Sequence, residues 1–128
     1  MRTYLRLAAI AIALAGVTMP AGAQNSLAGN WKITAVGVPC AVNLVITGRA
    51  AGAFTGQAAW ACRDGQQVNE NFVITTFPDH FEFVGKMISV NKGSWLAETF
   101  EVKLAADGRL QGTATDGQTS TTVTLTRQ

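Results

Sequence analysis

The stretch CAVNLVITGRAAGAFTGQAAWAC, from Cys40 to Cys62, holds both cysteines of the chain and decides the expected fold. Apolar residues recur at every second position on either side of a glycine-rich turn, which is typical of two half-buried antiparallel strands. The midpoint between the cysteines is Ala51, inside that turn. A hairpin folded about Ala51 therefore places the two cysteines opposite each other, and Leu44 opposite Ala58.

This hairpin register predicts one structural disulfide, Cys40–Cys62. Facing residues of antiparallel strands have Cα atoms about 4.5 to 5.5 Å apart, within reach of a disulfide. A redox pair or a metal site is the alternative for two cysteines. The chain has no Cys-x-x-Cys motif, however. Its single histidine, His80, does not provide enough ligands for a metal site with the two cysteines. We therefore expect neither a metal nor another cofactor.

The same period of two continues through most of the remaining chain. Segments that show it include 80–87, 96–104 and 123–125. Turn-forming pairs such as Asp107-Gly108 and Asp116-Gly117 separate them, and this spacing predicts about eight short strands in a sandwich or barrel. A meander of strands leaves two unpaired edges unless it closes. We therefore expect an all-β fold, a small antiparallel up-and-down barrel.

The first 23 residues have the organisation of a secretory signal peptide. A short cationic start precedes an apolar run that is too short to span a bilayer, and Ala21-Gly22-Ala23 supplies small residues for cleavage after Ala23. The expected organisation is a signal peptide at 1–23 and a single barrel domain at 24–128. The expected localisation is periplasmic or secreted, which agrees with a disulfide.

Cleavage would also change the charge of the protein. The full chain has ten Lys and Arg against eight Asp and Glu, and two of the ten are Arg2 and Arg6. The remainder is formally neutral and contains no basic run. This composition argues against nucleic acid or anionic lipid as a partner. No later segment is apolar enough to cross a membrane, so no stable membrane insertion is expected.

Few residues suggest catalysis. His80 follows Pro78-Asp79, and we interpret it as an exposed turn histidine rather than a general base. Glu98 is the acid that stands out on an apolar face, among Leu96 and Phe100. It faces either a ligand cavity or the water at the barrel rim, and we favour the rim because a buried unpaired carboxylate is costly. No catalytic residue is assigned, and the protein is not expected to be an enzyme.

Three tryptophans, Trp31, Trp60 and Trp95, are candidates for lining a ligand pocket. The alternative is that all three fill the barrel core, since side chains usually fill the interior of barrels this small. We favour the core interpretation.

The residues from Leu27 to Cys62 resemble the periplasmic inhibitors of serralysin-type metalloproteases. The shared features are Gly29-Asn30-Trp31, a cysteine that leads a strand of the form Cys-x-Val-x-Leu at 40–44, and a second cysteine after Trp60. Gly-x-Trp also opens lipocalin-like and avidin-like barrels. The resemblance implies an eight-stranded barrel with one disulfide and an N-terminal segment that reaches into the protease cleft. On this chain the protease-contacting residues would be Gln24, Asn25, Ser26 and Leu27.

The first functional hypothesis is therefore an exported β-barrel that acts by binding, as an inhibitor of a secreted metalloprotease. The second is a lipocalin-like or avidin-like binder of a small apolar ligand. The third is an envelope protein without a catalytic role. An open cup at the barrel mouth would favour the second hypothesis, and a filled interior would disfavour it.

Overall fold

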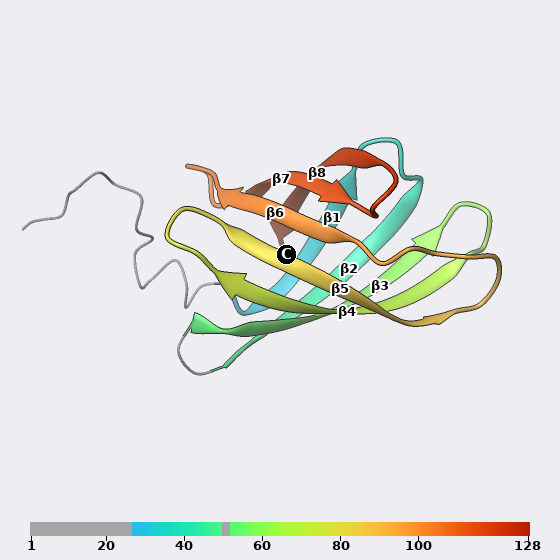
Figure 1. Cartoon of the computed structure of the whole chain (residues 1–128), viewed down its shortest axis with the longest axis horizontal. Helices are drawn as coiled ribbons and strands as arrows, with labels where there is room; N and C mark the ends of the chain where they lie inside the picture. The colour runs from blue at the N-terminus through green and yellow to red at the C-terminus, as the bar shows by residue number, and fades with distance from the viewer. Residues whose placement is uncertain (1–26, 50–51) are drawn as a thin grey trace, which may run out of the picture.

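Eight strands follow one another along the chain, and each is hydrogen-bonded to the next (Figure 1). The computed structural model describes residues 27–49 and 52–128. The strands are β1 (Gly29–Ala35), β2 (Cys40–Gly48), β3 (Phe54–Cys62), β4 (Gln67–Thr76), β5 (Phe81–Val90), β6 (Thr99–Leu104), β7 (Leu110–Thr115) and β8 (Ser120–Arg127). Strand β8 pairs antiparallel with β1, which closes the barrel. The predicted all-β up-and-down barrel is confirmed, and no α-helix occurs among these described residues. The signal peptide expected at 1–23 lies outside them.

The period of two in the sequence separates the inside of the barrel from the outside. In β2, Val42, Leu44 and Ile46 are buried, while the residues between them are exposed. The other strands repeat this alternation, because successive side chains of a strand point to opposite faces. A group of three phenylalanines, Phe72, Phe83 and Phe100, fills the middle of the interior with ring centroids 5.0 to 5.9 Å apart.

The hairpin from β2 to β3 has the predicted register. Cys40 faces Cys62, and Leu44 faces Ala58. The cysteines form a disulfide with a Cα–Cα distance of 3.9 Å. The central Ala51 of the predicted turn lies outside the described residues.

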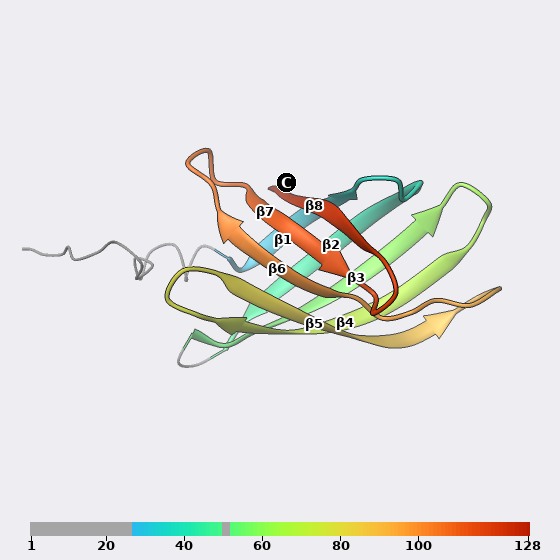
Figure 2. The same cartoon turned by 45° about the horizontal axis from the view of Figure 1, so that its top comes forward.

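The two ends of the barrel differ. The β2–β3, β4–β5 and β6–β7 connections gather at one end, which we call the closed end, and the other four connections gather at the opposite end, the mouth (Figures 1 and 2). At the closed end Leu27 is buried, and its carbonyl accepts a hydrogen bond of 2.8 Å from Trp31 Nε1. The guanidinium of Arg127 covers the Trp31 ring at 4.4 Å from its centroid. These contacts fill the closed end.

The predicted strand at 96–104 begins later than expected. Strand β6 starts at Thr99, and Leu96 is 46% exposed rather than in the core. The reason is that β5 and β6 pair over only four residues each, from Phe81↔Val102 to Val84↔Thr99. The chain before Thr99 has left the ladder and forms part of the mouth. The alternation of apolar and polar residues before Thr99 could not reveal this exposure, because it does not show where pairing with β5 ends.

We expect the disulfide to be a main source of stability. The bridge closes a loop with a sequence separation of 22 residues, which in the chain-entropy model stabilises the folded state by about 3 kcal/mol. The double variant C40A/C62A should therefore unfold at a clearly lower denaturant concentration than the wild type. Chemical denaturation followed by tryptophan fluorescence measures the difference. Reductant should lower the wild-type midpoint and leave that of the double variant unchanged; equal midpoints for both proteins without reductant would contradict the expectation.

Candidate functional site

A cavity of about 670 Å³ opens at the mouth of the barrel. Its apolar wall includes both cysteines of the disulfide, Trp60, Trp95 and Phe100. Polar residues that also line it are Arg63, Asp64, Gln66, Ser94, Glu98, Asp116, Thr119 and Thr121. Phe100, which packs against Phe72 and Phe83, is the member of the phenylalanine group that reaches the cavity. The interior is thus filled toward the closed end and hollow toward the mouth.

The β5–β6 connection supplies one side of this cavity and is held in place by the β3–β4 turn. Gln66 Nε2 donates hydrogen bonds of 3.0 and 3.2 Å to the carbonyls of Lys92 and Ser94. Asn91 Nδ2 donates to the Gly65 carbonyl at 3.0 Å. These bonds place Trp95 beside Trp60, with ring centroids 5.1 Å apart and an angle of 53° between the ring planes. The two indoles therefore form a tilted pair in the cavity wall.

Glu70 on β4 is the one charged residue of the described chain that is fully buried, with an exposed fraction of 1%. Its Oε1 accepts a hydrogen bond of 3.1 Å from Trp60 Nε1, and its Oε2 accepts one of 3.0 Å from the backbone N–H of Glu98. Glu70 thereby joins strands β3 and β4 to the start of β6.

Gly85 on β5 makes room for the Glu70 carboxylate. A Cβ atom at this position would collide with Glu70 Oε2 and would lie 2.6 Å from the Glu98 carbonyl oxygen. The Gly85 N–H donates to that same carbonyl at 2.8 Å. A glycine is therefore required where β5 passes the two glutamates, because any side chain would displace either the carboxylate or the backbone.

Glu98 lies in the cavity wall directly before β6. Its Oε1 is buried and has no hydrogen-bond partner, and the same holds for Trp95 Nε1. Burial, followed by hydrogen bonding to and repulsion from Glu70, raises the pKa of Glu98 to about 9. Burial also raises the pKa of Glu70, against the opposing effect of its hydrogen bonds. Since two adjacent buried carboxylates cannot both ionise cheaply, the pair holds one proton at neutral pH.

No cation neutralises these glutamates within the described part of the chain. The ion pairs there join His80 to Asp79 and Glu101, and Arg109 to Asp107, all away from the cavity. Nor do three His, Cys, Asp or Glu side chains among residues 27–49 and 52–128 stand where they could share a metal ion. The buried charge of the pair is balanced only by neutral hydrogen-bond donors.

The structure separates the predicted site residues. Trp31 and Trp60 are both buried in the core, as the core interpretation expects, and Trp95 is partly buried against it. Trp60 and Trp95 also line the cavity, whereas Trp31 lies at the closed end. Glu98 lies at the mouth, as predicted, but its Oε1 is buried rather than in water. Of the predicted protease-contacting residues, Leu27 packs into the closed end, and Gln24, Asn25 and Ser26 lie outside the described residues.

Glu70 corrects the expectation that Glu98 stands alone on an apolar face. In the β4 sequence QVNENFVITT, Glu70 has the same parity as Val68, Phe72 and Ile74. This alternation was sufficient to place Glu70 inside the barrel. Nothing local indicated its contact with Glu98, which is 28 residues away in the sequence.

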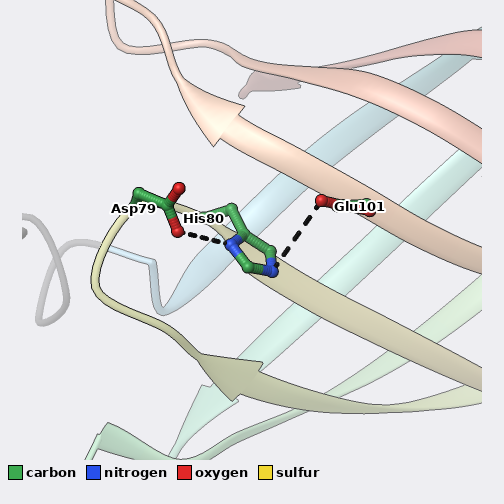
Figure 3. A network of polar contacts seen from close by, with 3 residues as sticks. All are labelled: Asp79, His80 and Glu101. Carbon is green, nitrogen blue, oxygen red and sulfur yellow. Dashed lines mark hydrogen bonds and ion pairs between the residues drawn. The ribbon is translucent and has the colours of Figure 1, made fainter. Parts of the chain in front are cut away.

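His80 lies in the β4–β5 connection at the closed end (Figure 3). Its Nδ1 is 2.7 Å from Asp79 Oδ1, its Nε2 is 3.9 Å from Glu101 Oε2, and its ring stacks on Phe77 at 4.7 Å between centroids. The side chain is 22% exposed, so it is more covered than the exposed turn histidine we predicted. These contacts hold the turn against β6.

No protein-family model matches the chain, and a search of curated proteins gives no match. The described residues also contain no helix that is long and apolar enough to cross a membrane.

The raised pKa values predict how stability depends on pH. The folded state holds the Glu98 proton up to about pH 9, whereas the ordinary pKa of 4.5 applies when the chain is unfolded. Between these values the folded state binds more protons than the unfolded state, so the free energy of unfolding falls as pH rises from 5 to 9. Glu98→Gln should make this decline shallower. Urea denaturation at pH 5, 7 and 9 measures both slopes, with Glu82→Gln, on the outward-facing side of β5, as the control. Parallel curves for Glu98→Gln and wild type would contradict the assignment.

Proposed function

We propose that this protein is a binding protein that takes a small, largely apolar ligand into the mouth of its barrel. The observation that carries the proposal is the open cavity of about 670 Å³ lined by Trp60, Trp95 and Phe100. Ligand sites in proteins are commonly concave, 300–1,000 Å³ in size as a rough range, and lined by aromatic side chains with a few polar groups. An eight-stranded barrel can hold one small ligand in its interior.

The walls of the cavity support this proposal in two further ways. The disulfide and the hydrogen bonds from Gln66 hold the cavity wall in place without a ligand. A pre-formed site loses less conformational entropy when a ligand binds. The unpartnered Trp95 Nε1 and Glu98 Oε1 are buried polar atoms of the kind that a ligand can satisfy. The ligand would therefore stack its apolar body on the indoles and place a polar group near Glu98.

The site of action follows from the disulfide and the N-terminal sequence. A disulfide is compatible with an oxidising compartment. We propose that residues 1–23 act as a signal peptide and that the barrel works in the periplasm or outside the cell.

Removing Trp95 should weaken ligand binding while the barrel still folds, because the residue lies on the connection over the mouth and outside the strands. A suitable probe is Nile red, a neutral dye whose fluorescence rises in apolar surroundings. We expect the wild type to bind it and Trp95→Ala to bind it about tenfold more weakly, which corresponds to about 1.4 kcal/mol of lost contact. Fluorescence titration measures both constants.

Phe77→Ala is the matched control for this experiment, because Phe77 is a partly exposed aromatic residue at the closed end. It should bind Nile red as the wild type does. Equal losses in the two variants, or no binding by the wild type, would contradict a ligand site at the mouth.

A second candidate function is inhibition of a secreted serralysin-type metalloprotease. The eight strands and the Cys40–Cys62 bridge are compatible with the resemblance of Leu27–Cys62 to such inhibitors. The specific observation in its favour is the anchoring of Leu27. Its burial and its bond with Trp31 fix the point from which the preceding residues would extend, at the end opposite to the cavity.

The inhibitor proposal predicts that Gln24, Asn25 and Ser26 are essential. Deleting these three residues should abolish inhibition of a serralysin-type protease, since the inhibitory contacts would be removed while the barrel stays intact. A protease assay with purified full-length and truncated protein measures this, and Nile red binding serves as the control for folding. Full inhibition by the truncated protein would exclude the mechanism.

A further inference from the structure

We propose that the mouth cavity selects an organic cation: its ligand joins an apolar body to an ammonium group that binds at Glu98, beside the indoles of Trp60 and Trp95. This inference rests on the proposed ligand-binding function and specifies the chemical class of the ligand. It follows from the charges in the wall, from the arrangement of the aromatic rings and from the two unpartnered atoms.

The first step is the uncompensated acid at the base of the cavity wall. Glu70 is 1% exposed, and its two hydrogen bonds come from neutral donors, Trp60 Nε1–H and the Glu98 N–H. A carboxylate this deeply buried is normally paired with a cation. Within the described chain no Lys, Arg or His contacts it. A cation bound in the adjacent cavity would lower the energetic cost of negative charge on the Glu70–Glu98 pair.

The second step is the sign of the remaining charges around the cavity. The ionisable residues in its lining are three acids, Asp64, Glu98 and Asp116, and one base, Arg63. Glu70 stands behind Glu98, and because this pair holds one proton it adds one negative charge to those of Asp64 and Asp116. Lys92, whose Nζ donates to the Asp64 carbonyl, adds a second positive charge beside that of Arg63. Asp64 and Asp116 accept backbone hydrogen bonds within their own turns, which hold both carboxylates at the mouth. The resulting field favours positively charged ligands and repels carboxylates and phosphates.

The third step is the indole pair. Trp60 and Trp95 present two rings with centroids 5.1 Å apart, tilted by 53°, next to these acids. Ammonium groups bind the faces of tryptophan rings within about 6 Å of the centroid, and aromatic walls are a common means of recognising organic cations. The barrel already contains one such contact at its closed end, where Arg127 covers Trp31 at 4.4 Å.

The fourth step explains the unpartnered atoms. Glu98 holds a proton at neutral pH, and neither its Oε1 nor Trp95 Nε1 has a hydrogen-bond partner. A cation at Glu98 favours the carboxylate form. The ionised Glu98 then pairs with the ammonium group, and its Oε1 is free to accept the Trp95 N–H. The proton of Glu98 passes to solvent, so one cation enters as up to one proton leaves.

Three probes with the same apolar body test the inference: 2-(1-naphthyl)ethylamine as the cation, 2-(1-naphthyl)ethanol as the neutral analogue and 1-naphthylacetate as the anion. Isothermal titration calorimetry of the whole protein at pH 7 should show the amine binding at least about tenfold more tightly than the alcohol, and the acetate most weakly. Titration of the amine in phosphate and in Tris buffers, which differ in ionisation enthalpy, should reveal proton release, and titration of the alcohol should not.

Glu98→Gln keeps the shape of the side chain and removes its charge. In this variant the ratio of amine to alcohol affinity should fall to near one, and proton release should vanish. Glu101→Gln, on the outer face of β6, should keep the wild-type ratio. A Glu98→Gln protein that still prefers the amine tenfold would overturn the inference. Circular dichroism confirms that each variant is folded, and the wild-type probe series decides the question if Glu98→Gln does not fold.

The outcomes separate the two proposals. Equal binding of amine and alcohol, or tightest binding of the acetate, would overturn selection of a cation and leave a ligand site at the mouth. Failure of all three probes and of Nile red to bind would overturn the ligand-binding function itself.

Discussion

The pairing of β1 with β8 is the constraint on which the rest of this structure depends. Five residue pairs, from Trp31↔Arg127 to Ala35↔Val123, join the first strand to the last and remove both edges of the sheet. In the closed barrel, every second side chain of each strand points inward, so the sequence alternation determines which residues fill the interior. Because the strands are antiparallel, alternate connections lie at the same end, and closure brings four of them together around the mouth.

The hollow at the mouth arises because β5 and β6 separate there. Where they are paired, Phe83 faces Phe100, and these rings pack with Phe72 of the neighbouring strand β4 inside the barrel. Beyond Val84↔Thr99 the ladder stops, and the chain turns over the mouth with Trp95 instead of completing the wall. Backbone groups freed in this way need other partners. Gly85 N–H bonds to the Glu98 carbonyl, and the Glu98 N–H bonds to the Glu70 carboxylate. Glu70 therefore substitutes for a missing strand, which gives a structural reason for a buried acid.

Much of this architecture could be predicted from the sequence, and the failures have a common physical cause. The fold and the register of Cys40 with Cys62 follow from alternation and from one turn midpoint, both of which are local. The inward position of Glu70 could also have been predicted from the alternation of residues within β4. The exposure of Leu96 and the contact between Glu70 and Glu98 depend on where the β5–β6 ladder ends. That point is a property of strand pairing and of packing between strands, which no short window of sequence contains.

The same acid that completes the backbone network also sets the chemistry of the cavity. If Glu70 served the backbone alone, a neutral acceptor such as glutamine would suffice and would avoid the cost of a buried charge. Burial, followed by the hydrogen bond with Glu70 and repulsion from its carboxylate, raises the pKa of Glu98 and keeps that side chain protonated beside an unpartnered indole N–H. No cation among the described residues pairs with these two glutamates. The closed end, by contrast, has its cation already in Arg127 over Trp31 and needs none from outside. This difference between two tryptophan sites in one barrel is the reason to seek a ligand at the mouth, and to seek a positively charged one.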